Sequence, residues 1–151
     1  MKAPVSALED HLGFWLRALS NAVHRRFEES LREHGVSVAQ WVALRRLYDV
    51  PFLSLNELAA LMSADQSSVS RLLDRLVTKG LVLRVSDTAD RRAVKLRLTD
   101  EATRLVPRLA RAADANDNIF FGAISKAERR QFEKSVRTLV QANAVEMATS
   151  D

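Results

Sequence analysis

The sequence predicts a mainly α-helical fold that includes one small β-hairpin. At four places Ser is followed three residues later by Glu or Gln, which is the pattern of a capped helix start. After each of these places apolar residues recur at helical spacing. Only between residues 81 and 98 does the apolar period change to two, the period of a β-strand. The length of 151 residues suits a single domain that spans residues 1–151.

Helix boundaries follow from the caps. The four capping boxes run from Ser6 to Glu9, Ser37 to Gln40, Ser54 to Glu57 and Ser125 to Glu128. Asp65 and Thr99 are expected to cap the starts of two more helices. Gly35, Gly80 and Gly122 stand where helices commonly end in the left-handed conformation.

Residues 7–34 and 100–147 predict long amphipathic helices at the two ends of the chain. The first segment carries one apolar stripe, formed by Leu8, Leu12, Trp15, Leu16, Leu19, Val23, Phe27 and Leu31. A helix of this length reaches about 40 Å, which exceeds what a small globule needs. Because apolar stripes left in water promote aggregation, we expect both segments to be dimerisation helices of a homodimer. The alternative is an intramolecular bundle in which these helices fold back on the central segment.

The central segment, residues 37–99, contains helix-turn-helix spacing. Residues 55–62 and 66–79 predict two helices joined by a turn at residues 63–65. In the second helix, five apolar residues recur at the spacing of a stripe that faces the core. They are Val69, Leu72, Leu73, Leu76 and Val77. The remaining sides present the candidate DNA-contacting residues Gln66, Ser67, Ser68, Ser70, Arg71 and Arg75.

These are residue types that read DNA. Small hydroxyls let a helix enter a major groove, and the Arg71 guanidinium can fork onto a guanine edge or a phosphate. Arg75, one turn later, suits the DNA backbone. We expect Asp74 to pair with Arg71, three residues before it. The alternative is that this side of the helix is an ordinary solvated polar face.

A basic hairpin follows the second helix. Residues 81–85 and 94–98 predict its two strands, and five basic residues face two acidic ones between residues 84 and 97. Its tip carries Arg91 and Arg92 beside Asp90. A protruding arginine can enter a narrow minor groove while a neighbouring carboxylate holds it in place. The combination predicts a winged helix-turn-helix that binds double-stranded DNA.

Composition and residue spacing argue against several other classes of protein function. Without cysteine the chain can form no disulfide, thiolate metal site or cysteine redox sensor. His11, His24 and His34 fall on different sides of one predicted helix, so we expect no metal site. No glycine-rich phosphate loop is present, and Ser67, Ser68 and Ser70 have no histidine nearby in the sequence, so we expect no cofactor and no enzyme. The absence of a long apolar run and of a leader pattern predicts a cytoplasmic, membrane-free protein.

Three stretches of the sequence resemble the MarR family of bacterial and archaeal regulators. Residues 54–82 are similar to the reading head of the family, and residues 39–47 show a weaker likeness. The most specific match is Asp90-Arg91-Arg92 followed by the alternating strand and Thr99, which resembles the wing signature. The resemblance implies that Arg92 is the minor-groove arginine, that Asp90 supports it, and that the side from Ser67 to Arg71 reads the major groove.

The resemblance also implies a triangular homodimer that usually represses transcription until a small ligand weakens DNA binding. Ser63 and Ala102 depart from the family, which often has glycine at both places. A small aromatic or anionic effector would lie where the dimer helices meet the DNA-binding lobe, with Trp15 or Trp41 in its wall. Alternatively both tryptophans are core residues. Two other function classes remain open: a winged-helix protein-interaction module without DNA binding, and a small enzyme with a distant catalytic pair.

Overall fold

The computed structural model describes residues 3–86 and 94–147. Six α-helices dominate the described chain: α1 (Leu12–Arg32), α2 (Val38–Tyr48), α3 (Leu55–Leu61), α4 (Gln66–Thr78), α5 (Asp100–Phe121) and α6 (Lys126–Ala142). A 3₁₀ turn, η1 (Leu8–Asp10), precedes α1. The strands are β1 (Leu53–Ser54), β2 (Val82–Ser86) and β3 (Val94–Leu98). The predicted mainly helical fold with a small β-hairpin is therefore confirmed.

The strands form one antiparallel sheet in the order β1-β3-β2. Val82 lies opposite Leu98 in the predicted hairpin, and Leu53 lies opposite Leu96 at the other edge of β3. The strand β1 was not predicted, because a strand of two residues that ends at the helix cap Ser54 carries no periodic signal. The wing sheet therefore has three strands.

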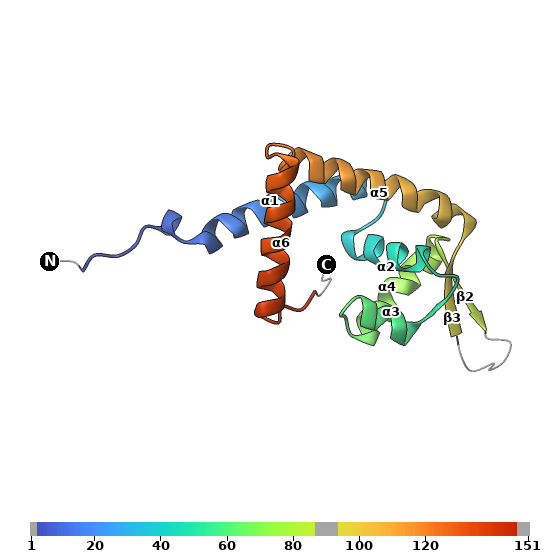
Figure 1. The fold of residues 1–151 in the computed structure, drawn as a ribbon. Helices are drawn as coiled ribbons and strands as arrows, with labels where there is room; N and C mark the ends of the chain where they lie inside the picture. The colour runs from blue at the N-terminus through green and yellow to red at the C-terminus, as the bar shows by residue number, and fades with distance from the viewer. Residues whose placement is uncertain (1–2, 87–93, 148–151) are drawn as a thin grey trace.

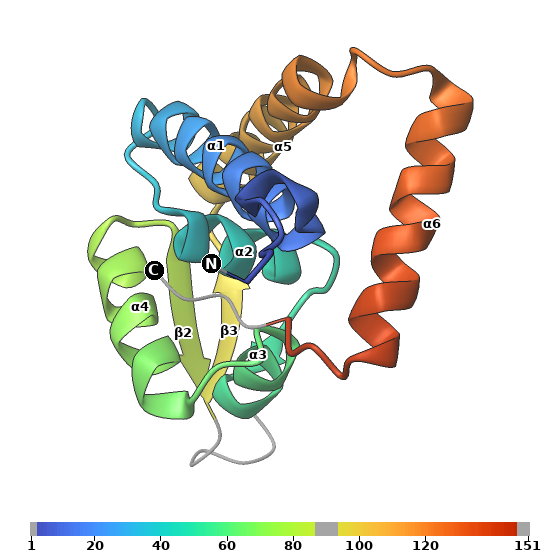
Figure 2. The same ribbon diagram turned by 90° about the vertical axis from the view of Figure 1, so that its left-hand side faces the viewer.

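The shorter helices and the sheet form a lobe beneath two long helices. Figure 1 shows α1 and α5 side by side, with α2, α3, α4 and the sheet beneath them. In Figure 2, α4 and the two longer strands lie on one side of the molecule, and α6 lies on the other. Buried leucines from most of these elements meet in one core, among them Leu44, Leu58, Leu73, Leu96 and Leu109. This core fixes which side of α4 faces outward.

Three of the four predicted capping boxes are confirmed. At the start of α3, the Ser54 hydroxyl accepts from the Glu57 amide at 3.2 Å, and the Ser54 amide donates to the Glu57 carboxylate at 2.7 Å. The same reciprocal bonds begin α2 at Ser37 and α6 at Ser125. Side-chain caps at Asp65 and Thr99 are confirmed as well. Local hydrogen bonding therefore places five helix starts.

The fourth capping box, Ser6 to Glu9, does not begin the first helix. The backbone of His11 is extended (φ −96°, ψ 119°), so α1 begins only at Leu12. Before it, the Ala7 amide donates to the Asp10 carboxylate at 2.9 Å, which closes the separate turn η1. The prediction of a helix from residue 7 was wrong because a competing local hydrogen bond stabilises a tighter turn there.

Two further details differ from the predictions. Gly35 and Gly80 adopt φ +69° at helix ends as expected, but Gly122 ends α5 with φ −73°. Close approach explains that glycine, because a Cβ at Gly122 would stand 2.4 Å from the Asn118 carbonyl oxygen. Val77 is 37% exposed and does not face the core as predicted. At 100° per residue Val77 lies about 80° from the Val69 direction, at the margin of the buried stripe.

Apolar side chains of both terminal segments lie in water in a single chain. Leu8, Leu12 and Trp15 are 67%, 66% and 55% exposed, and no residue of α6 is buried. The N-terminal part of the chain projects away from the lobe in Figure 1. The alternative of an intramolecular bundle folded over these stripes is therefore wrong. Trp15 is not a core residue, whereas Trp41 is half-buried against the core and packs edge-on against Phe27.

Candidate nucleic-acid interface

The polar side of α4 lies on the outside of the lobe. Burial of Val69, Leu72, Leu73 and Leu76 fixes the rotation of the helix about its axis. The opposite side then presents Gln66, Ser67, Ser68, Arg71 and Arg75, all of which are exposed, while Ser70 is half-buried at the edge. The sequence prediction placed all six of these side chains on the accessible sides of α4, and the structure leaves five of them exposed.

The N-terminal turn of α4 holds a hydrogen-bond chain that starts at Asp65. The Ser67 hydroxyl donates to one carboxylate oxygen of Asp65 at 2.5 Å, and the Ser68 hydroxyl donates to the other at 2.7 Å. The Ser68 amide donates to Asp65 Oδ1 at 2.9 Å, which is the helix cap. Arg71 Nη2 then donates to the Ser68 hydroxyl at 3.3 Å. Asp65 thereby orients both serines directly and Arg71 through Ser68.

Asp65 is held in its charged form. Hydrogen bonds from the hydroxyls of Ser67 and Ser68, and then from the Ser68 amide, lower the pKa of Asp65 well below its usual range. Since the carboxylate carries no proton, it can only accept, and both hydroxyl protons point toward it. The sequence predicted that Asp65 caps the helix, but not that its carboxylate accepts hydrogen bonds from the hydroxyls of Ser67 and Ser68.

Asp74 pairs with the wing and not with Arg71. Arg84 Nη1, at the start of the hairpin, donates to Asp74 Oδ1 at 2.7 Å. Both side chains are well exposed, so the pair contributes mainly to orientation. The predicted pairing of Asp74 with Arg71 was wrong because the spatial neighbour comes from a strand ten residues away, which helical spacing cannot show. The ion pair leaves Arg71 available and ties α4 to β2.

The turn and the far end of α4 are also constrained. Ser63, in the turn between α3 and α4, has φ +49°, a conformation that favours glycine. At the other end, Lys79 Nζ donates to the Gly35 carbonyl at 2.5 Å and to Gln40 Oε1 at 2.9 Å. This link joins the end of α4 to the turn between α1 and α2. No sequence signal predicted these hydrogen bonds, because Lys79 lies 44 residues from Gly35 and 39 residues from Gln40 in the sequence.

The predicted wing-tip residues Asp90, Arg91 and Arg92 lie outside the described residues. The strands that lead to them are described: Lys95 of β3 lies over the Phe52 ring at 5.8 Å, and Arg97 is exposed. Thr99 closes the sheet, because its hydroxyl donates to the Gly80 carbonyl at 2.8 Å and accepts from the Ala102 amide. Ala102 is fully buried.

Within the part of the chain that the structure describes, the interface is accompanied by neither a metal centre nor a membrane-spanning helix. Across residues 3–86 and 94–147, no cluster of three or more His, Asp or Glu side chains could hold a metal ion. Over the same ranges, no helix combines the length and apolarity that a bilayer crossing requires.

Comparison with known proteins agrees with this geometry. Residues 36–94 match the MarR family model. Over 82% of the chain and 75% of the relative, the sequence is 31% identical to a putative transcriptional regulatory protein for the hcr operon of Thauera aromatica. It is 37% identical to the HTH-type transcriptional repressor MdtR of Bacillus subtilis (strain 168), over 57% of the chain and 56% of that protein.

A solved structure extends the likeness to almost the whole fold. BpsR of Bordetella bronchiseptica, whose DNA binding is regulated by 6-hydroxynicotinic acid, is similar with a TM-score of 0.76 and 26% identity. The match covers 90% of this chain and 97% of BpsR. The sequence matches and the shared winged architecture lead to the same conclusion. The chain belongs to the MarR family of winged helix-turn-helix transcriptional regulators, which are not enzymes.

Proposed function

We propose that this protein is a homodimeric repressor that binds a pseudo-palindromic DNA site and releases it when a small molecule binds. In this proposal residues 37–99 form the DNA-binding lobe, and residues 7–34 and 100–147 form the dimer. The observation that carries it is the outward polar side of α4 with its Asp65-centred hydrogen bonds. The likeness to the repressor MdtR supports repression.

The polar side of α4 is suited to a specific kind of base reading. The protons of the Ser67 and Ser68 hydroxyls are engaged by Asp65, so their oxygens offer lone pairs outward. Ser68 already accepts from Arg71, which leaves Ser67 as the acceptor for an amino group of adenine or cytosine. Arg71 is then the side chain that forks onto a guanine edge. Gln66 and Ser70 flank these two contacts, and Arg75 faces the phosphate backbone.

The wing supplies the second contact. We assign Arg92, with Arg91 beside it, to the adjacent minor groove and Asp90 to its support. The ion pair between Arg84 and Asp74 links the base of the wing to α4. An arginine in a narrow minor groove reads groove width more than base identity.

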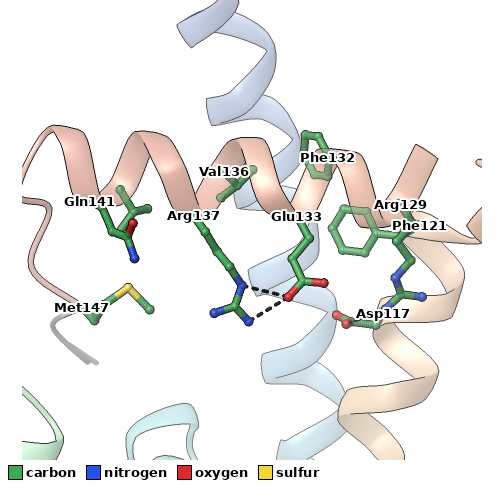
Figure 3. Close-up of a pocket in the computed structure, with 10 residues that line it drawn as sticks. Asp117, Phe121, Arg129, Phe132, Glu133, Val136, Arg137, Gln141 and Met147 are labelled. Carbon is green, nitrogen blue, oxygen red and sulfur yellow. Dashed lines mark hydrogen bonds and ion pairs between the residues drawn. The ribbon is translucent and has the colours of Figure 1, made fainter. Parts of the chain in front are cut away.

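Dimerisation is proposed from the uncovered apolar surfaces. Regulators of the MarR family bind DNA as dimers. A groove of about 630 Å³ runs along α6 and the end of α5, with Phe121, Phe132 and Val136 in its wall. Figure 3 shows these side chains beside the ion pair of Arg137 with Glu133. A second copy of the chain would cover this groove and the exposed N-terminal stripe together, which removes both from water.

An aromatic or anionic effector is proposed from the likeness to BpsR. The ligand that regulates DNA binding of BpsR, 6-hydroxynicotinic acid, is an aromatic acid. In the present chain the proposed effector is of the same class, a small aromatic or anionic compound. Trp15, in α1, and Trp41, in α2, are two aromatic side chains that could contact its ring.

Selection of bound duplexes from a random pool at defined salt tests the proposed function. The expected result is a pseudo-palindrome with half-site centres about 10 base pairs apart, since two α4 helices of one dimer enter successive major grooves. Enrichment of no sequence would contradict the proposal. If duplexes are not retained while a protein partner is, the chain is a winged-helix interaction module instead.

A further inference from the structure

Asp65 places a negative charge on the side of the lobe that is proposed to face DNA. The side chain is exposed, and it forms no ion pair with any residue in the ranges 3–86 and 94–147. Asp74, near the other end of α4, is instead paired with Arg84 at 2.7 Å. A free carboxylate beside DNA phosphates weakens the binding of every sequence, because like charges repel. Its presence at this position therefore requires a compensating role.

Helix capping alone does not explain the carboxylate. Asn and Ser cap helices about as well as Asp, since a cap needs only one oxygen for a backbone amide. Asp65 accepts three hydrogen bonds, from the Ser68 amide at 2.9 Å, the Ser67 hydroxyl at 2.5 Å and the Ser68 hydroxyl at 2.7 Å. The two hydroxyls donate to different carboxylate oxygens. Asn has a single accepting oxygen and Ser has one hydroxyl, so of these three caps only Asp can engage both hydroxyl protons.

The direction of these bonds decides what each serine can offer to a base. A hydroxyl whose proton is engaged by Asp65 retains only lone pairs for a further partner. Ser68 uses one of them for Arg71 Nη2 at 3.3 Å, whereas Ser67 accepts from no residue that the structure describes. In a major groove the amino groups of adenine and cytosine are donors, whereas thymine and guanine present keto oxygens, which are acceptors.

We propose that Asp65 is a positioning residue that sets base preference by fixing the Ser67 hydroxyl as an acceptor, while its charge lowers the affinity for DNA of every sequence. Ser67 then accepts from the amino group of adenine or cytosine. Reversal of that base pair brings a keto oxygen toward the same lone pairs, which turns the contact repulsive. This inference rests on the proposed DNA-binding function and adds the residue that fixes the hydrogen-bond direction at one base pair.

Asp65→Asn and Asp65→Ser separate the charge from the hydrogen-bond direction. Both variants lose the negative charge, and both retain an oxygen that can cap the Ser68 amide. In Asp65→Asn that oxygen can still accept from the Ser67 hydroxyl, as Asp65 Oδ1 does. In Asp65→Ser this acceptor is removed, so the Ser67 hydroxyl can rotate and donate to a keto oxygen as readily as it accepts. Ser67→Ala, which leaves the cap intact, is the reference for complete loss of the contact.

Fluorescence anisotropy of the intact chain is measured on the selected duplex, on duplexes with one base pair of each half-site reversed in turn, and on an unselected duplex. Wild type and Asp65→Asn are expected to share a preference of about threefold to tenfold at one position of each half-site, the effect of one hydrogen bond. Asp65→Ser and Ser67→Ala are expected to lose that preference. Both Asp65 variants are expected to bind the unselected duplex more tightly than wild type, most clearly at low salt.

A thermal scan verifies that each variant is folded. The inference is wrong if Asp65→Ser keeps the preference, or if Asp65→Asn loses it equally, because charge alone would then explain the loss. Unchanged affinity of both Asp65 variants for the unselected duplex would overturn the role of the charge. An unchanged preference in Ser67→Ala rules out the contact even if an Asp65 variant does not fold. If wild type retains no duplex at all, the proposed function itself fails.

Discussion

Replacing Arg71 by alanine should separate base reading from general electrostatic attraction. Arg71 is exposed on α4, and its guanidinium is held toward the Ser68 hydroxyl at 3.3 Å. Loss of a bidentate arginine–guanine contact costs about 1 to 3 kcal/mol per half-site, and therefore about 2 to 6 kcal/mol for two half-sites that act independently. Since 1.4 kcal/mol corresponds to a tenfold change, the dimer should lose roughly 30-fold in affinity or more.

The assay is fluorescence anisotropy on the selected duplex and on a set of single base-pair variants. The loss should be largest on the selected sequence and should remove discrimination at one position of each half-site. Arg111→Ala provides a control that removes the same charge from α5. A loss that is uniform over all duplexes would assign Arg71 to a phosphate and refute the base-reading role.

A double-mutant cycle tests how Arg71 is positioned. Ser68→Ala removes the acceptor that orients the guanidinium, so it should weaken DNA binding in the wild-type background and have a smaller effect once Arg71 is alanine. A coupling energy of about 0.5 kcal/mol or more is expected for side chains in one hydrogen-bonded network. Strictly additive effects would show that Ser68 acts independently of Arg71.

Four other predictions follow from particular residues. Asn116 is 4% exposed; its Nδ2 donates to the Val23 carbonyl at 3.2 Å, but its Oδ1 has no hydrogen-bond partner among the described residues. Because removing the unpaired buried oxygen outweighs the loss of that one bond, Asn116→Leu should raise the melting temperature by about 2 to 4 °C, for a gain of about 1 kcal/mol in a calorimetric scan. Ser63→Gly should raise the free energy of unfolding by about 0.5 to 1 kcal/mol in urea titrations, because Ser63 has φ +49°; a loss would show that the hydroxyl matters more than the backbone. Because the pKa of Asp65 is lowered on folding, its contribution to stability should be complete above the unfolded value of about 3.9 and disappear as pH falls toward the folded value, so Asp65→Asn should flatten the acid side of the stability profile. Leu12→Glu should convert the dimer to monomers in sedimentation velocity while far-ultraviolet circular dichroism stays unchanged, since Leu12 is 66% exposed in one chain; an unchanged dimer would place the interface elsewhere.

The parts of the fold that the sequence predicted are those set by local hydrogen bonds and by the period of apolar residues. The caps at Ser37, Ser54, Asp65, Thr99 and Ser125 each depend on a partner three residues away, so spacing alone identifies them. The outward side of α4 followed in the same way from its four buried residues. Five of the helix starts and the accessible side of the reading helix were therefore predictable.

The contacts that were missed are those between elements far apart in the sequence. The bonds of Lys79 to Gly35 and Gln40, and the pair of Arg84 with Asp74, depend on how elements pack, which periodicity does not specify. At the N-terminus, the local bond from Ala7 to Asp10 competed with helix formation, and capping rules alone do not decide between the two.

Because the chain contains no cysteine, a single introduced thiol can test directly whether the outward side of α4 enters DNA. In S67C the only thiol stands on the first turn of α4, and in S135C it stands on the exposed surface of α6. Alkylation rates are measured with and without the selected duplex, after anisotropy has verified that each variant binds it. DNA is expected to slow alkylation of S67C strongly and to leave alkylation of S135C unchanged. Equal rates for S67C with and without bound duplex would contradict it.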